Sequence, residues 1–234
     1  MTKLRLADFR HVVFFTGAGL SAESGIPTYR GHGGIWKQYN YEDYACQRAF
    51  ETDPNKVWDF HDQRRQKIAS CEPNAGHQVI AELQRTRESA VGIITQNIDG
   101  LHQRAGATEV VELHGSLWRV RCDREGMVRS DFTVPANPRW CSCGQPFRPD
   151  IVWFGDSLNA RNLKTAMALL SGCDLLVSVG TSAVVYPAAE LPNIAMKRGA
   201  MTVEINLEDT PMSGLYRQHL RGKASEILAE LASG

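Results

Sequence analysis

The sequence has 234 residues, 43% of them hydrophobic, which is enough for one main domain with a sizeable core. Its 26 Lys and Arg residues balance 26 Asp and Glu residues, so no overall field attracts the protein to nucleic acid or to an anionic membrane, although a local basic patch remains open. The charged N-terminus and the lack of a long apolar stretch argue against a secretory signal and a transmembrane helix, so we expect a soluble, cytoplasmic protein.

The first predicted element is a buried strand over His11–Phe15, followed by a glycine-rich turn and a helix that begins near Ser21. The turn reads GAGLSA and fits G-x-G-x-x-G/A, in which the first glycine makes the tight turn and the second, Gly19, lets a pyrophosphate approach the backbone. Free N–H groups at the helix N-terminus favour a phosphate there. A tight strand-to-helix turn without a ligand is the alternative.

No acidic residue follows about 20 residues later at the end of a second strand, where a dehydrogenase would hold the adenosine ribose. The loop Pro27–Trp36 stands there instead, and we expect it to cover the nucleotide. The ribose contacts must therefore come from later strand ends. Gly180–Ser182 and Asn206–Glu208 are the candidates, because open α/β sheets bind ligands at their carboxyl edge.

Two predicted helices, Pro54–Ser70 and Asn74–Arg87, precede a strand over Ala90–Thr95. That strand ends in Gln96–Asp99, whose amide and carboxylate groups suit the orientation of a sugar or a carboxamide. The alternative is a hydrogen-bonded turn with a helix cap, which is a routine use of Asn and Asp.

A short predicted strand, Glu109–Leu113, comes next and leads into His114. An imidazole beside a glycine at a strand end is a candidate general base, although an isolated histidine is more often structural. The convergence of several polar strand ends on one sheet edge favours the catalytic interpretation.

The rest of the chain continues the alternation of short apolar runs and helix-period stretches. Because strands that alternate with helices form a parallel sheet covered on both faces, we predict an α/β, Rossmann-like, doubly wound fold. The further expected elements are helix Leu163–Ser171, strand Asp174–Val179, helix Ala188–Arg198, strand Met201–Ile205 and helix Lys223–Leu231.

Six motifs occur in the order and approximate spacing of the sirtuin family, which comprises NAD-dependent protein-lysine deacylases: GAGLSAESGIPTYRG, TQNIDGLHQRAG, ELHGS, IVWFGD, GTSAVVYPAA and EINLE. The match runs from about His11 to Leu231, and the chain resembles a short sirtuin of the bacterial type. The resemblance implies a sirtuin-type catalytic domain over 1–234. It also implies a helical insertion for the cofactor loop and acyl pocket at about 32–75, and a small zinc-ribbon-like insertion at about 119–149.

The resemblance assigns roles to the residues that match the family's motifs. His114 matches the catalytic histidine, and Asn97 is the second catalytic position. Val152, Trp153, Phe154 and Gly155 match the segment on which an acylated peptide lies, main chain to main chain. The implied NAD contacts are Gly17, Ala18, Gly19, Ser21, Ala22, Glu23, Thr28, Tyr29, Arg30, Trp36, Gln96, Asn97, Ile98, Asp99, Gly180, Thr181, Ser182, Asn206, Leu207, Glu208 and Ala224.

In the implied reaction NAD is consumed rather than reduced. The acyl-lysine carbonyl oxygen captures the ribose carbon as nicotinamide departs, and His114 takes a proton from a ribose hydroxyl, whose oxygen then attacks the alkylimidate carbon. Water completes the transfer, which leaves free lysine, nicotinamide and O-acyl-ADP-ribose. An imidazole near its reference pKa of about 6.5 suits this role.

Six cysteines in a chain of this size do not indicate a disulfide scaffold, and Cys46, Cys71 and Cys173 stand alone. Sirtuins usually hold a structural Zn²⁺ with two C-x-x-C pairs. Here the pairs are eroded to CDRE and CSC, which leaves three thiols, with Glu125 or Asp123 as candidate fourth ligand. A metal-free β-rich insertion is the alternative to a zinc site. The predicted zinc ligands are Cys122, Cys141 and Cys143.

The stretch DPNKVWDF and its surroundings resemble class III sirtuins, which remove succinyl, malonyl and glutaryl groups and carry Tyr-x-x-Arg in the acyl pocket. Arg64 stands at the arginine position, and His61 replaces the tyrosine. At i and i+3 the two side chains share one helix face, so we expect Arg64 to fork a substrate carboxylate and His61 to donate a further hydrogen bond. The alternative for 61–67 is a solvated charged face.

Other functions remain open at this level. The missing acidic ribose residue disfavours an NAD oxidoreductase. A protein mono-ADP-ribosyltransferase would leave ADP-ribose on protein, a noncatalytic NAD sensor would not need His114, and a deacetylase without activity on acidic acyl groups is the narrower alternative. The expected partners are acylated lysine side chains of proteins, bound as an extended peptide, with no specific nucleic acid and no membrane.

Overall fold

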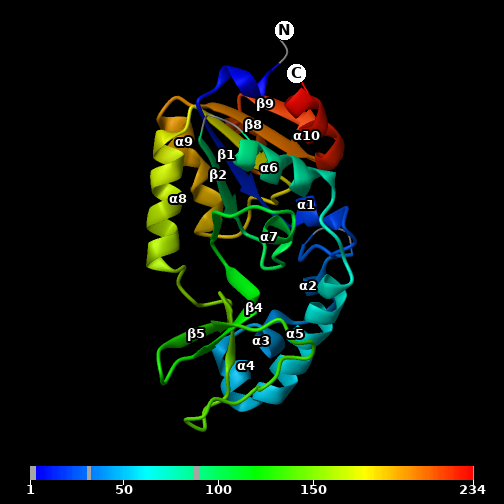
Figure 1. Cartoon of the computed structure of the whole chain (residues 1–234), viewed down its shortest axis with the longest axis vertical. Helices are drawn as coiled ribbons and strands as arrows, with labels where there is room; N and C mark the ends of the chain where they lie inside the picture. The colour runs from blue at the N-terminus through cyan, green and yellow to red at the C-terminus, as the bar shows by residue number, and fades with distance from the viewer. Residues whose placement is uncertain (1–3, 31–32, 87–89, 234) are drawn as a thin grey trace.

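The computed structural model describes residues 4–30, 33–86 and 90–233. Its main body is a six-stranded sheet with strand order β3-β2-β1-β7-β8-β9, and all neighbouring strands run parallel (Figure 1). This arrangement confirms the predicted α/β fold. The strands of the sheet are β1 (His11–Thr16), β2 (Ala90–Thr95), β3 (Val110–Glu112), β7 (Leu175–Val179), β8 (Met201–Asn206) and β9 (Gln218–Arg221).

Helices cover both faces of this sheet, with α6 and α10 on one face and α8 and α9 on the other (Figure 1). Successive strand residues point to opposite faces, so a strand covered on both sides must be apolar at nearly every position. In β1, Phe14 belongs to one of the two cores and Phe15 to the other. The helices around the sheet are α1 (Ala18–Ala22), α6 (Ala75–Thr86), α7 (Leu101–Arg104), α8 (Ala160–Gly172), α9 (Pro192–Lys197) and α10 (Ala224–Ser233).

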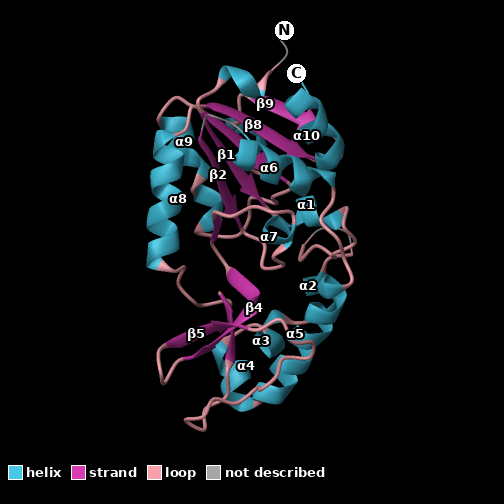
Figure 2. Ribbon diagram, in the orientation of Figure 1, coloured by secondary structure: helices cyan, strands magenta, loops and turns pink. Residues whose placement is uncertain are grey.

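A second, smaller body combines a three-stranded antiparallel sheet of order β5-β4-β6 with four helices, and it lies beyond the carboxyl ends of the main strands (Figure 2). Its longest helix, α5, begins at Pro54. Asp53 is a favourable N-cap for this helix, because its side chain accepts a hydrogen bond from the Lys56 N–H. Its elements are β4 (Gly115–Cys122), β5 (Met127–Ser130), β6 (Arg148–Ile151), α2 (Ile35–Gln38), α3 (Tyr41–Tyr44), α4 (Gln47–Thr52) and α5 (Pro54–Ala69).

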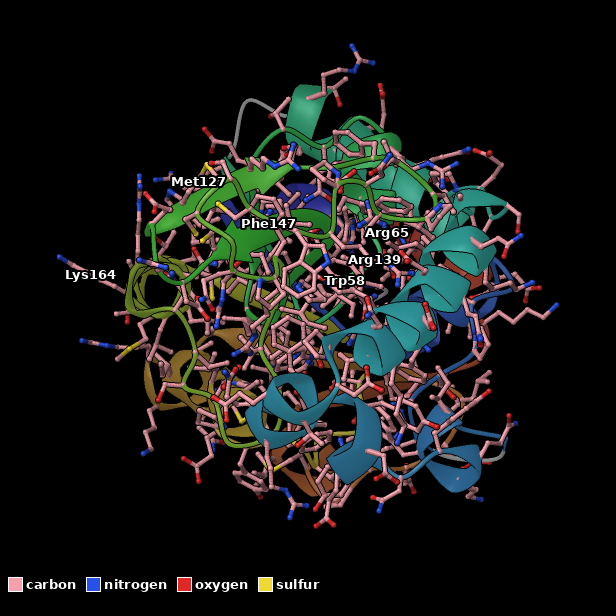
Figure 3. All side chains as sticks on the ribbon, turned by 90° about the horizontal axis from the view of Figure 1, so that it is seen from below. Trp58, Arg65, Met127, Arg139, Phe147 and Lys164 are labelled. Atoms are coloured by element: carbon pink, nitrogen blue, oxygen red, sulfur yellow. The ribbon has the colours of Figure 1, made fainter. Side chains whose placement is uncertain are left out.

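One side of α5 is bonded to the loops around the small sheet. Trp58 donates from Nε1 to the Phe147 carbonyl at 2.6 Å, and Arg65, fully buried, lies 3.4 Å from the Asp131 carboxylate. Arg139 pairs with two carboxylates of the same helix. In Figure 3 the labelled side chains of these contacts gather between α5 and the strands, whereas Met127 lies apart on β5. Helix α5 and the small sheet therefore pack as one unit.

Several elements differ from the prediction. The helix expected over 188–198 is a 3-10 turn, Ala188–Glu190, followed by α9, because Pro192 has no N–H to continue a helix and instead starts a new one. The edge strand β9 was not predicted, since its residues are half-buried or exposed and form no apolar run. Further 3-10 turns span Leu6–Asp8 and Ser213–Leu215.

The predicted end of one helix at Arg87 and the predicted start of the helical insertion at 32 lie outside the described residues. Within the described part of the chain, no helix has the length and apolar character needed to cross a membrane.

Candidate active site

The glycine-rich turn after β1 packs directly against the turn after β7. The Gly19 N–H donates to the Gly180 carbonyl at 2.8 Å. A Cβ atom on Gly19 would lie 2.7 Å from the Gly180 Cα, and one on Gly17 would lie 2.8 Å from the Gly180 carbonyl oxygen. The Gly180 backbone therefore excludes a side chain at Gly19, and this constraint holds without any nucleotide.

We expect Gly19→Ala to lower the free energy of unfolding by about 1–3 kcal/mol, because the backbone on one side must move to relieve the overlap. For a domain of this size each 1 kcal/mol corresponds to about 2–4 °C in Tm, which differential scanning calorimetry measures. The control is Gly172→Ala at the exposed end of α8, where an added Cβ meets nothing within 4 Å. Equal Tm values for the two variants would contradict the packing constraint.

A buried hydrogen-bonded cluster joins the glycine turn to the end of β2. Asn97 donates from Nδ2 to the Gly17 carbonyl at 3.0 Å and to the Ser21 hydroxyl at 3.2 Å. The Ser21 hydroxyl donates to Asp99 at 2.8 Å, and Asp99 also accepts from the Leu101 N–H at 2.9 Å. Burial raises the pKa of Asp99, and these two hydrogen bonds oppose that shift. Two predicted motifs thus meet, and the bond from Leu101 to Asp99 forms a hydrogen-bonded turn directly before α7.

The ends of β2, β7 and β8 are connected in the same way. Gln96 donates from Nε2 to the Thr181 hydroxyl at 2.9 Å, and Asn206 donates from Nδ2 to the Thr181 carbonyl at 2.8 Å. Leu207, which follows Asn206, is 70% exposed. The structure therefore brings the three predicted strand ends to one edge of the sheet.

The remaining predicted nucleotide contacts border this edge. The Glu23 carboxylate accepts from the Ser225 N–H at 3.2 Å, which ties the end of α1 to the start of α10 next to the buried Ala224. Ile98 lies in the core of the smaller body. Ser182 and Glu208 are exposed.

His114 lies at the start of β4 with one ring nitrogen fixed. Its Nδ1 is 2.9 Å from the Gln96 carbonyl oxygen, which only accepts hydrogen bonds, so Nδ1 carries the proton and Nε2 keeps a lone pair. Burial lowers the pKa of His114. The hydrogen bond to Gln96 raises this pKa, and the positive charge of Arg30 lowers it further. Since the carbonyl of His114 accepts from the Val152 N–H at 2.9 Å, the backbone of His114 lies beside the predicted peptide-binding segment. A neutral imidazole held in this way is suited to general-base chemistry.

Aromatic side chains from the predicted cofactor loop meet this segment. The Trp36 ring lies 5.6 Å from that of Tyr29, 6.0 Å from Phe60 and 5.8 Å from Phe154, measured between ring centroids. The hydroxyl of the half-buried Tyr29 is itself buried, and desolvation raises its pKa. These rings would exclude water from the space next to the cluster of polar strand ends.

Arg64 has no carboxylate partner among the ion pairs of the described residues, and its Nε is buried without a hydrogen bond. Its guanidinium carbon lies 4.5 Å from the Tyr29 ring centroid. It lines a pocket of about 180 Å³ between α5, Ile26 and the two ends of α2, Ile35 and Tyr39. An unpaired guanidinium at such a pocket is a strong candidate for binding an anionic group.

His61 is only 3% exposed, and its Nε2 accepts a hydrogen bond from Trp153 Nε1 at 3.3 Å. Burial lowers the pKa of His61 to about 3, and the positive charge of Arg64 adds to this effect. His61 is therefore neutral, and its Nε2 already has a partner on the peptide-binding segment. The side chains of His61, Asp62 and Arg65 are buried, so this stretch of α5 is not a solvated charged face.

Sequence comparison is consistent with this geometry. The model of the Sir2 family matches residues 17–187. The NAD-dependent protein deacylase 2 of Pyrobaculum aerophilum is 48% identical over 97% of this chain and 91% of its own length. The chain belongs to the Sir2 family, the sirtuins.

Other sirtuins support the same assignment. The mitochondrial NAD-dependent protein deacylase sirtuin-5 of the dog, Canis lupus familiaris, is 39% identical over 96% of this chain and 84% of its own length. A crystal structure of a Sir2 homologue with NAD superposes with a TM-score of 0.90 at 43% identity, covering 97% of this chain and 90% of the other. A Sir2 complex with a p53 peptide and NAD⁺ superposes with a TM-score of 0.83 at 31% identity, covering 97% and 94%.

The predicted zinc ligands of this sirtuin lie together. The sulfur atoms of Cys122, Cys141 and Cys143 are all within 4.8 Å of one another, and those of Cys122 and Cys143 are 3.5 Å apart. Thiolates about 2.3 Å from a tetrahedral ion would be spaced in this range. In the described part of the chain no carboxylate joins the three sulfur atoms, and Asp123 instead pairs with Arg121 at 2.9 Å.

The sirtuin also has a buried polar network that the sequence analysis missed. Thr16 donates to the Thr95 hydroxyl at 2.9 Å and lies 3.0 Å from His102 Nε2. The ring of His102 contacts that of His77, whose Nε2 is 3.3 Å from the Ser21 hydroxyl. Burial lowers the pKa of His77 to about 4 and that of His102 to about 3. Neither histidine stands at a strand end, so only three-dimensional contacts reveal their connection to Ser21.

These buried histidines should make the sirtuin less stable in mild acid. A histidine that stays neutral in the fold but has a pKa of about 6.5 when unfolded takes up its proton only on unfolding, so stability is lost as the pH falls below about 6.5. At pH 5 the expected loss is about 2 kcal/mol for each of His61, His77 and His102. Urea denaturation between pH 7 and 5 measures it, and His102→Gln should make the dependence less steep by roughly a third. An unchanged slope in that variant would count against a neutral His102.

Proposed function

We propose that this sirtuin is an NAD-dependent protein-lysine deacylase that releases nicotinamide and O-acyl-ADP-ribose. We further propose that the whole chain serves as one catalytic domain, with the α2–α5 region and the thiol-bearing sheet as its two insertions. The observation that carries the proposal is the position of His114. Its Nδ1 is bonded to the Gln96 carbonyl at the nucleotide edge, and its own carbonyl is bonded to Val152 of the peptide segment.

The polar groups at the sheet edge fit NAD. Amide and hydroxyl groups of Gln96, Asn97 and Thr181 converge there, and the aromatic rings of the cofactor loop adjoin them. When bound, NAD supplies a ribose carbon that becomes electrophilic as nicotinamide leaves. Asn97 and Asp99, held through Ser21, would position the nicotinamide ribose. The Nε2 atom of His114 would accept a proton from a ribose hydroxyl, since its lone pair is free and its lowered pKa keeps it neutral near pH 7.

The acyl-lysine peptide would lie on Val152–Gly155 as an added strand. Backbone hydrogen bonds of this kind bind a peptide without reading its side chains, which predicts broad sequence tolerance. The Sir2 complex with a p53 peptide provides a precedent from a relative of the same fold.

The test of this function is the identity and ratio of the products. Purified protein incubated with NAD and an acetyl-lysine peptide should give deacylated peptide, nicotinamide and O-acetyl-ADP-ribose in equal amounts by mass spectrometry. ADP-ribose attached to protein would instead support the mono-ADP-ribosyltransferase alternative. Formation of NADH, detected by its absorbance, would support an oxidoreductase. No release of nicotinamide with any acyl peptide would indicate a noncatalytic NAD-binding protein.

Within this function, we propose that acidic acyl groups are substrates, which makes the enzyme a desuccinylase and demalonylase as well as a deacetylase. Support comes from Arg64, a partly buried guanidinium without an ion-pair partner among the described residues that lines a pocket next to the cofactor loop. A carboxylate at the end of an acyl chain would supply a direct ion-pair partner. Activity on acetyl-lysine peptides without any activity on succinyl-lysine peptides would instead support a plain deacetylase.

The three clustered thiols fit one structural zinc ion, with Cys122, Cys141 and Cys143 as ligands and a fourth position left to a non-protein ligand. We expect about one zinc per chain by plasma mass spectrometry, with Cys141→Ser reducing it to near zero. Cys173→Ser is the control, because this buried thiol lies in a different core from the cluster. Zinc-free protein from zinc-supplemented cells would instead support the metal-free insertion.

A further inference from the structure

An ion pair joins the start of β6 to the end of the segment that follows this strand. Arg148, at the start of β6, is 3% exposed, and one of its NH2 groups donates to the Asp156 carboxylate. A full charge at this depth is costly unless it is paired and bonded. The pair encloses residues 151–155, on which the proposed peptide lies.

The same groups determine the path of the enclosed backbone. The Asp156 oxygen that pairs with Arg148 also accepts from the Trp153 N–H at 3.0 Å, and the Asp156 N–H donates back to the Trp153 carbonyl at 3.0 Å. Arg148 further contacts the Ile151 carbonyl at 3.4 Å. Both ends of the segment are thus bonded to a single guanidinium–carboxylate unit.

The Trp153 side chain anchors the middle of the segment inside the protein. The Arg148 guanidinium carbon lies 3.8 Å from its ring centroid, and its Nε1 donates to His61 on α5. Arg148 also donates to Gln47 of α4 at 2.6 Å, so the segment is attached to the helical insertion from two sides. His61 therefore acts on the peptide segment through Trp153.

The neighbouring residues keep unpaired backbone groups. Among the described residues, no hydrogen bond involves the carbonyls of Val152 and Phe154 or the N–H of Gly155. Gly155 adopts a left-handed conformation with φ 91°, which turns the chain back toward Asp156. Phe154 and Gly155 therefore form a turn, and the unpaired Val152 carbonyl before it is a group that an added strand could bond.

We propose that Arg148 and Asp156 are positioning residues for the peptide substrate. Their ion pair, with Trp153 packed beneath the guanidinium, holds Val152–Gly155 in the shape that pairs with an acylated peptide. This inference rests on the proposed function, because it assumes that the peptide binds on this segment.

The test is steady-state kinetics of Asp156→Asn, which removes the charge but keeps the size of the side chain. We expect KM for the acyl peptide to rise about ten-fold or more, as for the loss of a buried charge partner, while kcat changes less than about two-fold. The Kd for NAD, measured by calorimetry, should stay within about two-fold, since none of the contacts of Asp156 with described residues reaches the nucleotide edge. A change that merely destabilised the fold would not raise the peptide KM while leaving the NAD Kd unchanged.

The matched control is Asp131→Asn, which breaks the buried Arg65–Asp131 pair of the same smaller body. Among the described contacts this pair does not touch residues 151–156, so the control should leave peptide KM unchanged. An equal rise in peptide KM in both variants, or no rise in Asp156→Asn, would overturn the proposal. Wild-type protein that releases no nicotinamide with any acyl peptide would instead refute the proposed function.

If Asp156→Asn does not fold, Gln47→Leu takes its place. Among the described side-chain hydrogen bonds, this change removes the one from Arg148 to α4 and the one between Gln47 and Glu51. It should raise peptide KM about three-fold with the NAD Kd unchanged, and Glu51→Gln controls for the second contact. An unchanged peptide KM in Gln47→Leu would likewise count against a positioning role of Arg148.

Discussion

Replacing His114 by alanine should reduce the rate of nicotinamide release with acyl peptides by about 10²–10⁴-fold, the usual contribution of a general base. The reason is that His114 is the imidazole fixed between the nucleotide edge and the peptide segment, with Nε2 free to accept a proton. Turnover at saturating NAD and peptide, followed by chromatography of nicotinamide, measures the effect. The NAD Kd should change little, because the side-chain hydrogen bonds of Gln96 and Asn97 do not involve His114. The imidazole contacts only the backbone carbonyl of Gln96 among these groups.

The control for this variant is His11→Ala, which removes an exposed imidazole at the start of β1, at the opposite end of the strand from the site. Its kcat should match that of the parent protein. If His114→Ala turned over acyl peptides at the parental rate, the proposed deacylation chemistry would have to be abandoned.

The second large effect concerns Arg64. We expect Arg64→Met to lower kcat/KM for succinyl-lysine peptides by about 30-fold or more, since a substrate carboxylate would lose its partner in a partly buried pocket, a loss of at least about 2 kcal/mol. Methionine keeps the apolar length of the side chain, so activity on acetyl-lysine should stay within about three-fold. Parallel kinetics on the two peptides measure the ratio.

Lys56→Met is the matched control, because Lys56 is a cation of the same helix that does not line the Arg64 pocket. It should leave the succinyl-to-acetyl ratio unchanged. A loss of both activities to the same extent in Arg64→Met would rule out Arg64 as the determinant of acyl selectivity. His61→Tyr then tests whether a hydroxyl at this position adds to the carboxylate contact or disturbs the bond to Trp153.

Much of the fold could be read from the sequence because burial within one element is a local property. The apolar runs in β1, β2, β7 and β8 follow from the need to cover both faces of a parallel sheet, and their predicted bounds agree with the structure to within one residue. The edge strand β9 lacks this signal, since one side of it meets solvent. Pro192 marks the break before α9, because proline cannot continue a preceding helix.

The candidate site was predictable to the extent that its residues follow strand ends. The structure brings Gly17, Asn97, His114 and Thr181 to one edge, as expected for parallel strands that all end there. The three cysteines were also recognisable by type and spacing, and their sulfur atoms do lie together. Conversely, the sequence offered Asp123 as a candidate fourth ligand, and an ion pair with Arg121 directs it elsewhere.

The sequence by itself determined the four central strands of the main sheet, which strand ends carry polar groups, and that the chain has the motifs of a sirtuin. Only the tertiary structure decided that Gly19 faces the Gly180 backbone, that His61 bonds Trp153, and that Arg148 pairs with Asp156. The physical reason is that periodicity records whether a side chain is buried, whereas its partner is set by packing between elements far apart in the chain. A buried polar atom must find a partner somewhere, but the sequence does not specify which one.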